Sequence, residues 1–130
     1  TERNVADTLV LATGTGCASD PAPDSTRHSG PGTTTAFYMG VRHAGRLAGD
    51  LMAKGMPASA PVDVAVDVSK PGQRHIGTTL GALAETLHGN DVSGCAVLLV
   101  TWPKRQHAHR AHDRGLAGHD ASWRKPAIAL

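Results

Sequence analysis

Residues 33–55 read TTTAFYMGVRHAGRLAGDLMAKG, and this stretch decides the expected fold class. Residues 33–39 are β-branched and then aromatic, which predicts a strand that ends in a tight turn at Gly40. Apolar residues then return at helical spacing, at Val41, Ala44, Ala48, Leu51 and Met52. This spacing predicts an amphipathic helix, and Gly55 predicts where that helix ends. A strand followed directly by a helix is the repeating unit of α/β folds.

The segments on either side extend this alternation. Residues 7–13 (DTLVLAT) are apolar at consecutive positions, which predicts a strand covered on both faces. Residues 62–68 (VDVAVDV) alternate, which predicts a strand with its valines on one face. Three elements complete the pattern: a short strand at residues 73–76, a helix capped by Thr78 or Thr79 and ended by Gly89, and a strand at residues 96–101. The chain is therefore expected to form an α/β fold, with residues 14–32, rich in Gly and Pro, as a long surface loop.

The composition excludes several classes of protein. The chain has 130 residues, which is enough for one domain. No apolar run approaches the roughly 20 residues that span a bilayer, so no membrane partner is expected. A formal net charge of +2 and the scarcity of aromatic residues argue against a nucleic-acid partner. The two cysteines lie far apart and no signal-like segment is evident, which predicts a reduced, cytoplasmic protein.

Residues 104–130 differ in composition from the rest of the chain. They mix Lys and Arg with histidine and lack apolar periodicity, which predicts a basic, His-rich and poorly ordered tail. Side chains of the kind that ligate zinc occur there: His107, His109, His112, Asp113, His119 and Asp120. A metal site also needs a rigid scaffold with supporting hydrogen bonds, and the sequence indicates neither. A solvated tail is therefore the preferred interpretation, and no metal is predicted.

Other candidates for chemistry each have a simpler interpretation. Residues 13–16 (TGTG) follow a strand as a phosphate loop would, but a Pro- and Asp-rich segment stands where that loop requires a helix. Cys17 has acidic neighbours in the sequence, which disfavour a reactive thiolate, and Cys95 is expected to be a small core residue. Asp63 and Asp67 fall on one side of a strand as paired catalytic carboxylates could, although a solvated strand face is the preferred interpretation. No G-x-S-x-G motif is present, and no catalytic residue is predicted.

Several short motifs occur in a fixed order between residues 33 and 101. They are FYMG at residues 37–40, GMP at 55–57, PV at 61–62, QR at 73–74, TLGALA at 79–84 and the apolar run at 96–100. In this order they resemble the C-terminal domain of the tetrapyrrole methylases, and residues 3–13 resemble the segment that joins the two domains of that family. The strongest likeness is to the members that methylate uroporphyrinogen III.

The resemblance implies a mixed sheet flanked by helices, with residues 1–103 as the C-terminal domain and the family's N-terminal domain absent from this chain. It also implies a cytoplasmic methyltransferase, homodimeric at full length, that uses S-adenosylmethionine to convert uroporphyrinogen III to precorrin-2 on the way to sirohaem and cobalamin. The family's G-x-G-x-G-D loop belongs to the N-terminal domain. The chain is therefore expected to be a fragment that binds the cofactor poorly and is inactive alone.

Carried over by position, the resemblance implies three cofactor-binding residues. Met39 would lie beside the cofactor, where its soft side chain conforms to a ligand. Val68 and Ala96, at the ends of their strands, would offer backbone groups, as strand ends do in open α/β sheets. Arg42 and His43 follow Met39 and are candidates for the carboxylates of the substrate, although exposure to solvent is the preferred interpretation of both.

Two alternatives stay open. A methyltransferase that acts on a later corrin precursor would share these features and differ in its substrate pocket. A non-catalytic α/β assembly module would keep the fold and a subunit contact without the reaction.

Overall fold

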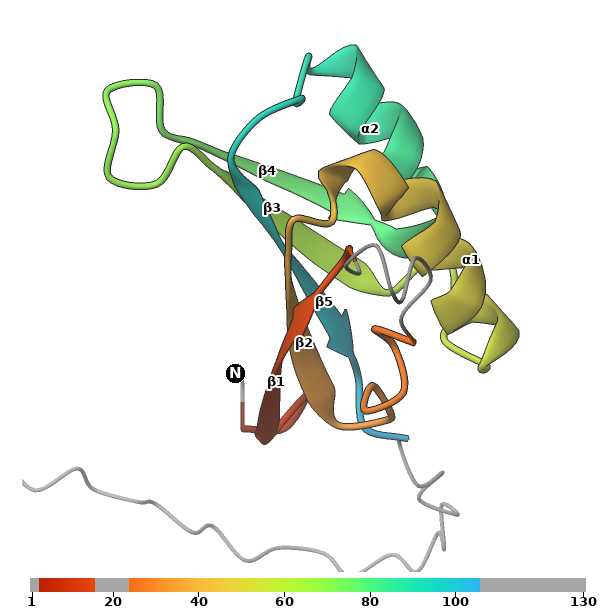
Figure 1. The fold of residues 1–130 in the computed structure, drawn as a ribbon. Coiled ribbons are helices and arrows are strands. Elements are labelled where there is room, and N and C mark those ends of the chain that lie inside the picture. The colour runs from red at the N-terminus through yellow and green to blue at the C-terminus, as the bar shows by residue number, and fades with distance from the viewer. Residues whose placement is uncertain (1–2, 16–23, 106–130) are drawn as a thin grey trace, which may run out of the picture.

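A five-stranded sheet with two helices on one of its faces organises the computed structural model, which describes residues 3–15 and 24–105 (Figure 1). The strands are β1 (Thr8–Thr13), β2 (Thr33–Tyr38), β3 (Pro61–Val66), β4 (Arg74–Thr79) and β5 (Ala96–Trp102). Their order in the sheet is β1-β2-β5-β3-β4; β1 and β2 are parallel, and the other neighbours are antiparallel. The helices are α1 (Ala44–Ala53) and α2 (Leu83–Gly89), each preceded by a 3-10 turn, η1 (Val41–His43) and η2 (Leu80–Ala82). The expected α/β fold with a mixed sheet is confirmed.

The core lies between the helices and one face of the sheet. Alternate residues of the central strands point into it, so that Val62, Val64 and Leu98 are almost fully buried. From the helical side, α1 contributes Leu51 and α2 contributes Leu83, both at most 1% exposed. The alternating valines of residues 62–66 and the helical spacing of α1 are thus both explained by burial against a single layer.

No helix among the described residues covers the opposite face of the sheet (Figure 1). Leu9 and Leu11 of β1 point to this face and are 58% and 66% exposed, whereas Ala12 packs against the core. Tyr38 of β2 is also exposed. The prediction that residues 7–13 form a strand covered on both faces is wrong for the described residues, because the helices occupy one face only.

Element ends follow the sequence signals in part. Gly55, with φ of 101°, ends α1, and the Met56 amide donates to the Leu51 carbonyl at 3.1 Å, as in a Schellman motif. Gly89 is the last residue of α2, as expected. The predicted threonine cap is confirmed in position only: Thr79 is the N-cap residue of η2, but its side chain makes no capping hydrogen bond. Thr78 Oγ1 instead lies 2.7 Å from Thr86 Oγ1. The predicted short strand at residues 73–76 extends to Thr79.

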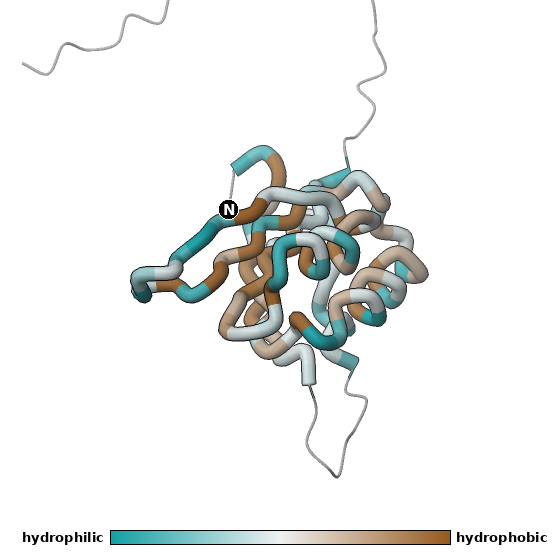
Figure 2. Tube along the Cα trace, turned by 90° about the horizontal axis from the view of Figure 1, so that it is seen from above, coloured by the Kyte–Doolittle hydropathy of each residue, from teal (hydrophilic) through white to brown (hydrophobic). Residues whose placement is uncertain are grey.

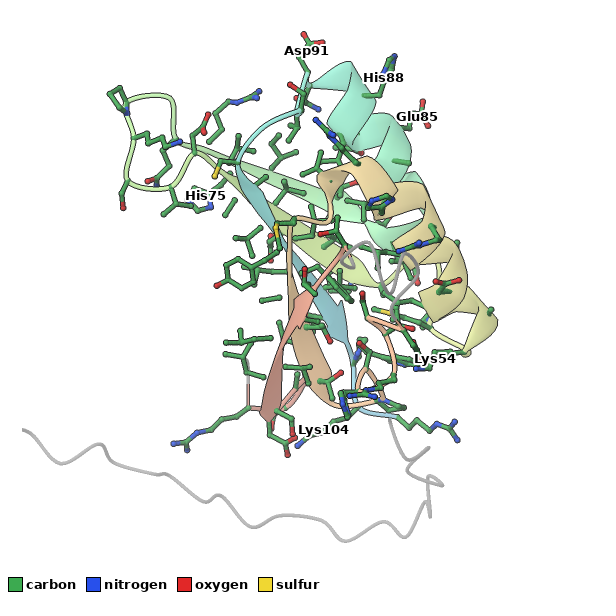
Figure 3. All side chains as sticks on the ribbon, in the orientation of Figure 1. Lys54, His75, Glu85, His88, Asp91 and Lys104 are labelled. Carbon is green, nitrogen blue, oxygen red and sulfur yellow. The ribbon has the colours of Figure 1, made fainter. Side chains whose placement is uncertain are left out.

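Part of the predicted surface loop is packed against the fold. Thr26 and Ser29 are buried, and Ser29 Oγ lies 2.8 Å from Thr35 Oγ1 of β2. Lys54, just past α1, donates from Nζ to the Thr26 carbonyl at 2.5 Å (Figure 3). Residues 24–32 therefore cover one end of the core with polar side chains that satisfy one another, a role that composition alone does not indicate.

Two glycines fix the ends of β1 and β2 against each other. The Gly14 amide donates to the Tyr38 carbonyl at 2.7 Å. A Cβ at Gly14 would lie 2.4 Å from the Cα of Gly40, so the two backbones meet where no side chain fits. This contact holds the start of the loop after β1 beside the residue that follows β2.

Truncating a leucine side chain should lower the free energy of unfolding by different amounts on the two faces of the sheet. Leu51→Ala removes a side chain buried between α1 and the sheet and should lower the free energy of unfolding by about 2–5 kcal/mol. Leu11→Ala, on the uncovered face, should lower it by less than about 0.5 kcal/mol. Urea unfolding followed by circular dichroism checks both, and an equal loss for the two variants would contradict a sheet with one open face.

The contact of the two glycines predicts a second pair of outcomes. Gly14→Ala should destabilise the fold by about 1–3 kcal/mol, because the added methyl group meets backbone that has no room to move. Gly49→Ala, on α1 with nothing within 4 Å of the new Cβ, should instead stabilise by about 0.5–1 kcal/mol. Thermal unfolding of both variants measures the difference, and a neutral Gly14→Ala would show that the backbones do not touch.

Candidate functional site

The ends of two strands and the start of a third surround a cavity at one end of the central strands. The cavity measures about 480 Å³, within the range typical of small-molecule sites. Its lining comes from the end of β2, the end of β3 with the hairpin that follows, and the start of β5: Tyr38, Met39, Ala65, Asp67, Val68, Lys70, Gly94, Cys95, Ala96 and Val97. Met39, Val68 and Ala96, far apart in the sequence, thus line one cavity.

Met39 owes its position to an unusual backbone conformation. Its φ of 55° lies in the left-handed region, which costs a residue with a side chain roughly 1–2 kcal/mol. The turn ends β2 at Tyr38 and leaves the Met39 side chain 64% exposed beside the cavity rather than in the core. The contact between Gly14 and Gly40 holds Thr15 nearby, and the Thr15 Oγ1 atom lies 4.0 Å from the Met39 sulfur. Strain of this kind at an exposed apolar residue is typical of functional sites.

Val68 reaches the cavity by a similar turn. Residues 62–68 were expected to form one strand with four valines on the same face, but β3 ends at Val66. Asp67 has φ of 47°, and its amide donates to the Cys95 carbonyl at 2.8 Å. The chain therefore changes direction, and Val68, 52% exposed, lies past the strand instead of in the core. The prediction that Val68 shares a face with the other valines is wrong.

The start of β5 supplies the third wall. Ala96 is the first residue of β5 and pairs with Val66 of β3. Cys95, directly before it, is exposed and lines the cavity, so its predicted role as a core residue is wrong. Gly94, Cys95 and Ala96 give this wall small side chains.

The hairpin after β3 contributes charged side chains to the lining of the cavity. Lys70 Nζ lies 3.5 Å from Asp67 Oδ1, and these are the two charged residues of the lining. The rest of the lining is apolar or glycine. Such a site fits a ligand with a largely apolar body and a charged group.

Of the two residues that follow Met39 as substrate candidates, the structure brings one to the site. Arg42 is exposed and lines a neighbouring hollow of about 230 Å³ together with Met39 and Thr15. His43 is half-buried in η1 and lines no cavity that contains Met39. The expectation that both face solvent thus holds for Arg42, which stands at the rim.

The paired-carboxylate hypothesis fails on geometry. Asp63 lies within β3 and lines a different cavity of about 480 Å³, which also includes Leu9 and Leu99 on the uncovered face. Asp67 belongs to the turn after the strand. The two carboxylates therefore face no common hollow.

The remaining sequence candidates fall partly outside the described residues. Cys17, the rest of the 13–16 motif beyond Thr15, and the tail histidines all lie there. Within residues 3–15 and 24–105, no three His, Cys, Asp or Glu side chains group as metal ligands. The same residues contain no helix long and apolar enough to cross a membrane.

The resemblance proposed Met39, Val68 and Ala96 as site residues, and the structure places all three at one cavity, but the sequence analysis did not name their neighbours there. Tyr38 and Cys95 each adjoin one of those residues, which is the signal that could have found them. Lys70 lies in the SKPG turn after the alternating strand, where a hairpin tip was expected and a ligand was not considered.

Comparison with known proteins is consistent with this geometry. No protein-family model matches the chain. Over 100 residues it is 28% identical to siroheme synthase of Hydrogenovibrio crunogenus, covering 77% of this chain and 21% of that protein. The crystal structure of uroporphyrin III C-methyl transferase from Thermus thermophilus superposes with a TM-score of 0.65 at 21% identity, over 77% of this chain and 42% of that one. A structure of the Thermus thermophilus enzyme complexed with S-adenyl homocysteine gives a TM-score of 0.62 at 20% identity, over 77% and 42%.

A cobalamin biosynthetic enzyme, cobalt precorrin-4 methyltransferase, is equally similar in fold, with a TM-score of 0.65 at 19% identity over 78% of this chain and 43% of that one. The chain thus spans about a fifth of its curated relative and less than half of each solved structure. The resemblance noted in the sequence is confirmed: the chain is similar in sequence to a siroheme synthase and shares the fold of part of the tetrapyrrole methyltransferase structures.

Proposed function

We propose that residues 1–103 are the C-terminal, cofactor-binding domain of a methyltransferase that uses S-adenosylmethionine and acts on a tetrapyrrole. The observation that carries the proposal is the cavity lined jointly by Met39, Val68 and Ala96, the three positions that the family resemblance assigned to the cofactor. Relatives with this fold are tetrapyrrole methyltransferases, and one of them was crystallised with S-adenyl homocysteine.

The residues of this chain would bind and orient the cofactor rather than transfer protons. S-adenosylmethionine, when bound, supplies a methyl group already activated on a sulfonium sulfur. Met39 offers a polarisable side chain against the ligand, and Val68 and Ala96, which line the cavity at strand ends, would offer backbone hydrogen-bonding groups. The apolar lining excludes water and aligns the reacting groups, which fits a site without a catalytic acid or base.

For the substrate we propose uroporphyrinogen III, with a later corrin precursor as the alternative. Both carry carboxylates, and Arg42 stands at the rim beside Met39, where a guanidinium could pair with one of them. The matching structures include a uroporphyrin III C-methyl transferase and a cobalt precorrin-4 methyltransferase, so the fold alone does not choose between the two substrates. In the full-length enzyme we propose a cytoplasmic homodimer whose other domain completes the cleft.

The cofactor proposal predicts weak but specific binding by the chain alone. S-adenosylhomocysteine should bind with a Kd of about 1 mM, because one wall of the cleft provides only part of the contacts. Met39→Lys should abolish the heat of binding in calorimetric titration, since it places a charged chain in an apolar cavity. Met52→Lys, at a partly exposed methionine of α1 outside the cavity, should bind like the parent.

No binding by the parent up to about 10 mM, or equal loss in both lysine variants, would contradict the proposal. The unfolding transition of each variant, measured in the same buffer, separates loss of the site from loss of the fold.

A second candidate function is a non-catalytic assembly module. The uncovered apolar face around Leu9 and Leu11 favours it, because monomeric proteins seldom expose contiguous apolar surface of this kind. An assembly module would associate with rising concentration in sedimentation and would give no heat with S-adenosylhomocysteine. The methyltransferase domain gives heat whatever its state of association, so the same titration distinguishes the two.

A further inference from the structure

We propose that residues 121–130 (ASWRKPAIAL) bind the uncovered face of the sheet in their own chain, with the Trp123 side chain in the hollow near Leu9 and the cations that follow it beside Asp63. This hollow and the cavity beside Met39 share no lining residue. The inference therefore stands apart from the proposed function and can fail without it.

The sheet register places the walls of the hollow side by side on one face. The hollow measures about 480 Å³, and its lining includes Leu9, Thr34, Pro61, Asp63, Leu99 and Thr101. Thr34 of β2 pairs with Leu9 of β1 on one side and with Thr101 of β5 on the other, and Leu99 of β5 pairs with Asp63 of β3. The hollow thus crosses four strands, on the side of the sheet away from the two helices (Figure 2).

The lining offers apolar surface and a single charge. Leu9 is 58% exposed, and the Thr34 and Thr101 hydroxyls lie 3.1 Å apart and bond to each other. Asp63 is the one charged residue of the lining, and no cation among the described residues forms an ion pair with it. A large apolar side chain next to a cation matches this lining, because it buries apolar area and complements the carboxylate.

The chain leaves the described residues at the rim of this hollow. Past β5 the Lys104 amide donates to the carbonyl of Val5, which lines the hollow, at 2.7 Å. The described residues end at Arg105, and Trp123 follows 18 residues later. A flexible chain of that length has an end-to-end distance of roughly 20–25 Å. The Trp123 side chain can therefore reach the hollow.

Residues 121–130 have the composition that the hollow requires. Trp123 is the one aromatic residue after Trp102, and Arg124 and Lys125 follow it directly. An indole buries a large apolar area, and tryptophan and arginine are the residues that most often dominate the energy of a contact. The interpretation of a solvated, His-rich tail is kept for residues 106–120, which connect this segment to the sheet.

The tether makes a weak site sufficient. A short flexible linker gives the segment an effective concentration of about 1 mM at its site. A segment with a Kd of about 0.1 mM for the hollow is then bound about 90% of the time, without any second protein.

Acrylamide quenching of Trp123 fluorescence in the full chain tests the inference. The Trp123 signal is the difference between each protein and the same protein with Trp123→Phe, which subtracts Trp102. In the parent, Trp123 should be quenched about 5-fold less than a free tryptophan amide, because it is bound most of the time. Leu9→Lys places a cation in the hollow and should raise the quenching about 3-fold, and Asp63→Asn removes one exposed ion pair and should raise it about 2-fold.

Matched control variants make the same charge changes on α1. Met52→Lys adds a cation at a methionine that is 39% exposed, and Asp50→Asn removes an exposed carboxylate. Both lie on the helical side of the sheet, so neither should change the quenching of Trp123. The unfolding transition of each variant, followed by circular dichroism, separates release of the segment from loss of the fold.

Three outcomes would overturn the inference. Quenching of Trp123 in the parent as strong as that of a free tryptophan amide would show that the segment does not bind. Protection that persists in both Leu9→Lys and Asp63→Asn would place the segment elsewhere. Protection that disappears on dilution, together with a dimer in sedimentation, would assign the face to a second copy of the chain.

Discussion

Left-handed backbone at two strand ends determines which side chains reach the cavity. Met39, directly after β2, has φ of 55° and Asp67, directly after β3, has φ of 47°, and β5 lies between these strands in the sheet. Without these turns each strand would continue, and its alternating side chains would place Met39 and Val68 on one face of the sheet or the other. The turns instead place both residues beside the cavity. Each turn costs roughly 1–2 kcal/mol, and the cost is met by the hydrogen bond of the Asp67 amide to Cys95 and by the packing of Gly14 on Gly40. The site is therefore a product of backbone geometry more than of reactive side chains.

Much of the fold could be predicted because its signals are local. The spacing of apolar residues in α1, the alternation of residues 62–68 and the glycines at 55 and 89 each act within a few positions. The structure bears out the helix and the two glycines, and it bears out the alternation as far as Val66. The ends of β2 and β3 could not be derived in this way, since neither Met39 nor Asp67 is a glycine and nothing in the local pattern indicates a left-handed turn. The resemblance to a known family identified Met39, Val68 and Ala96, whereas Lys70 required the hairpin in three dimensions.

Burial explains the clearest failure of the sequence analysis. Consecutive apolar residues in β1 predicted cover on both faces, but the structure covers one, and Leu9 and Leu11 lie on the other. The matching solved structures are more than twice as long as the part that superposes on this chain. β1 is apolar on both faces, but the described residues cover only one of them. This is expected of a domain whose second face contacts another part of a larger protein. The cavity beside Met39 opens on that same side of the sheet, next to Tyr38.

The central claim is that three separated segments bind one ligand, and amide chemical shifts measured by NMR test it most directly. On titration with S-adenosylhomocysteine, the amide signals of Met39, Val68 and Ala96 should move together and fit a single dissociation constant. Signals of Thr34 and Leu99, which line the cavity at the other end of the uncovered face, should stay in place. Movement at that second cavity alone, or separate constants for the three segments, would contradict the account.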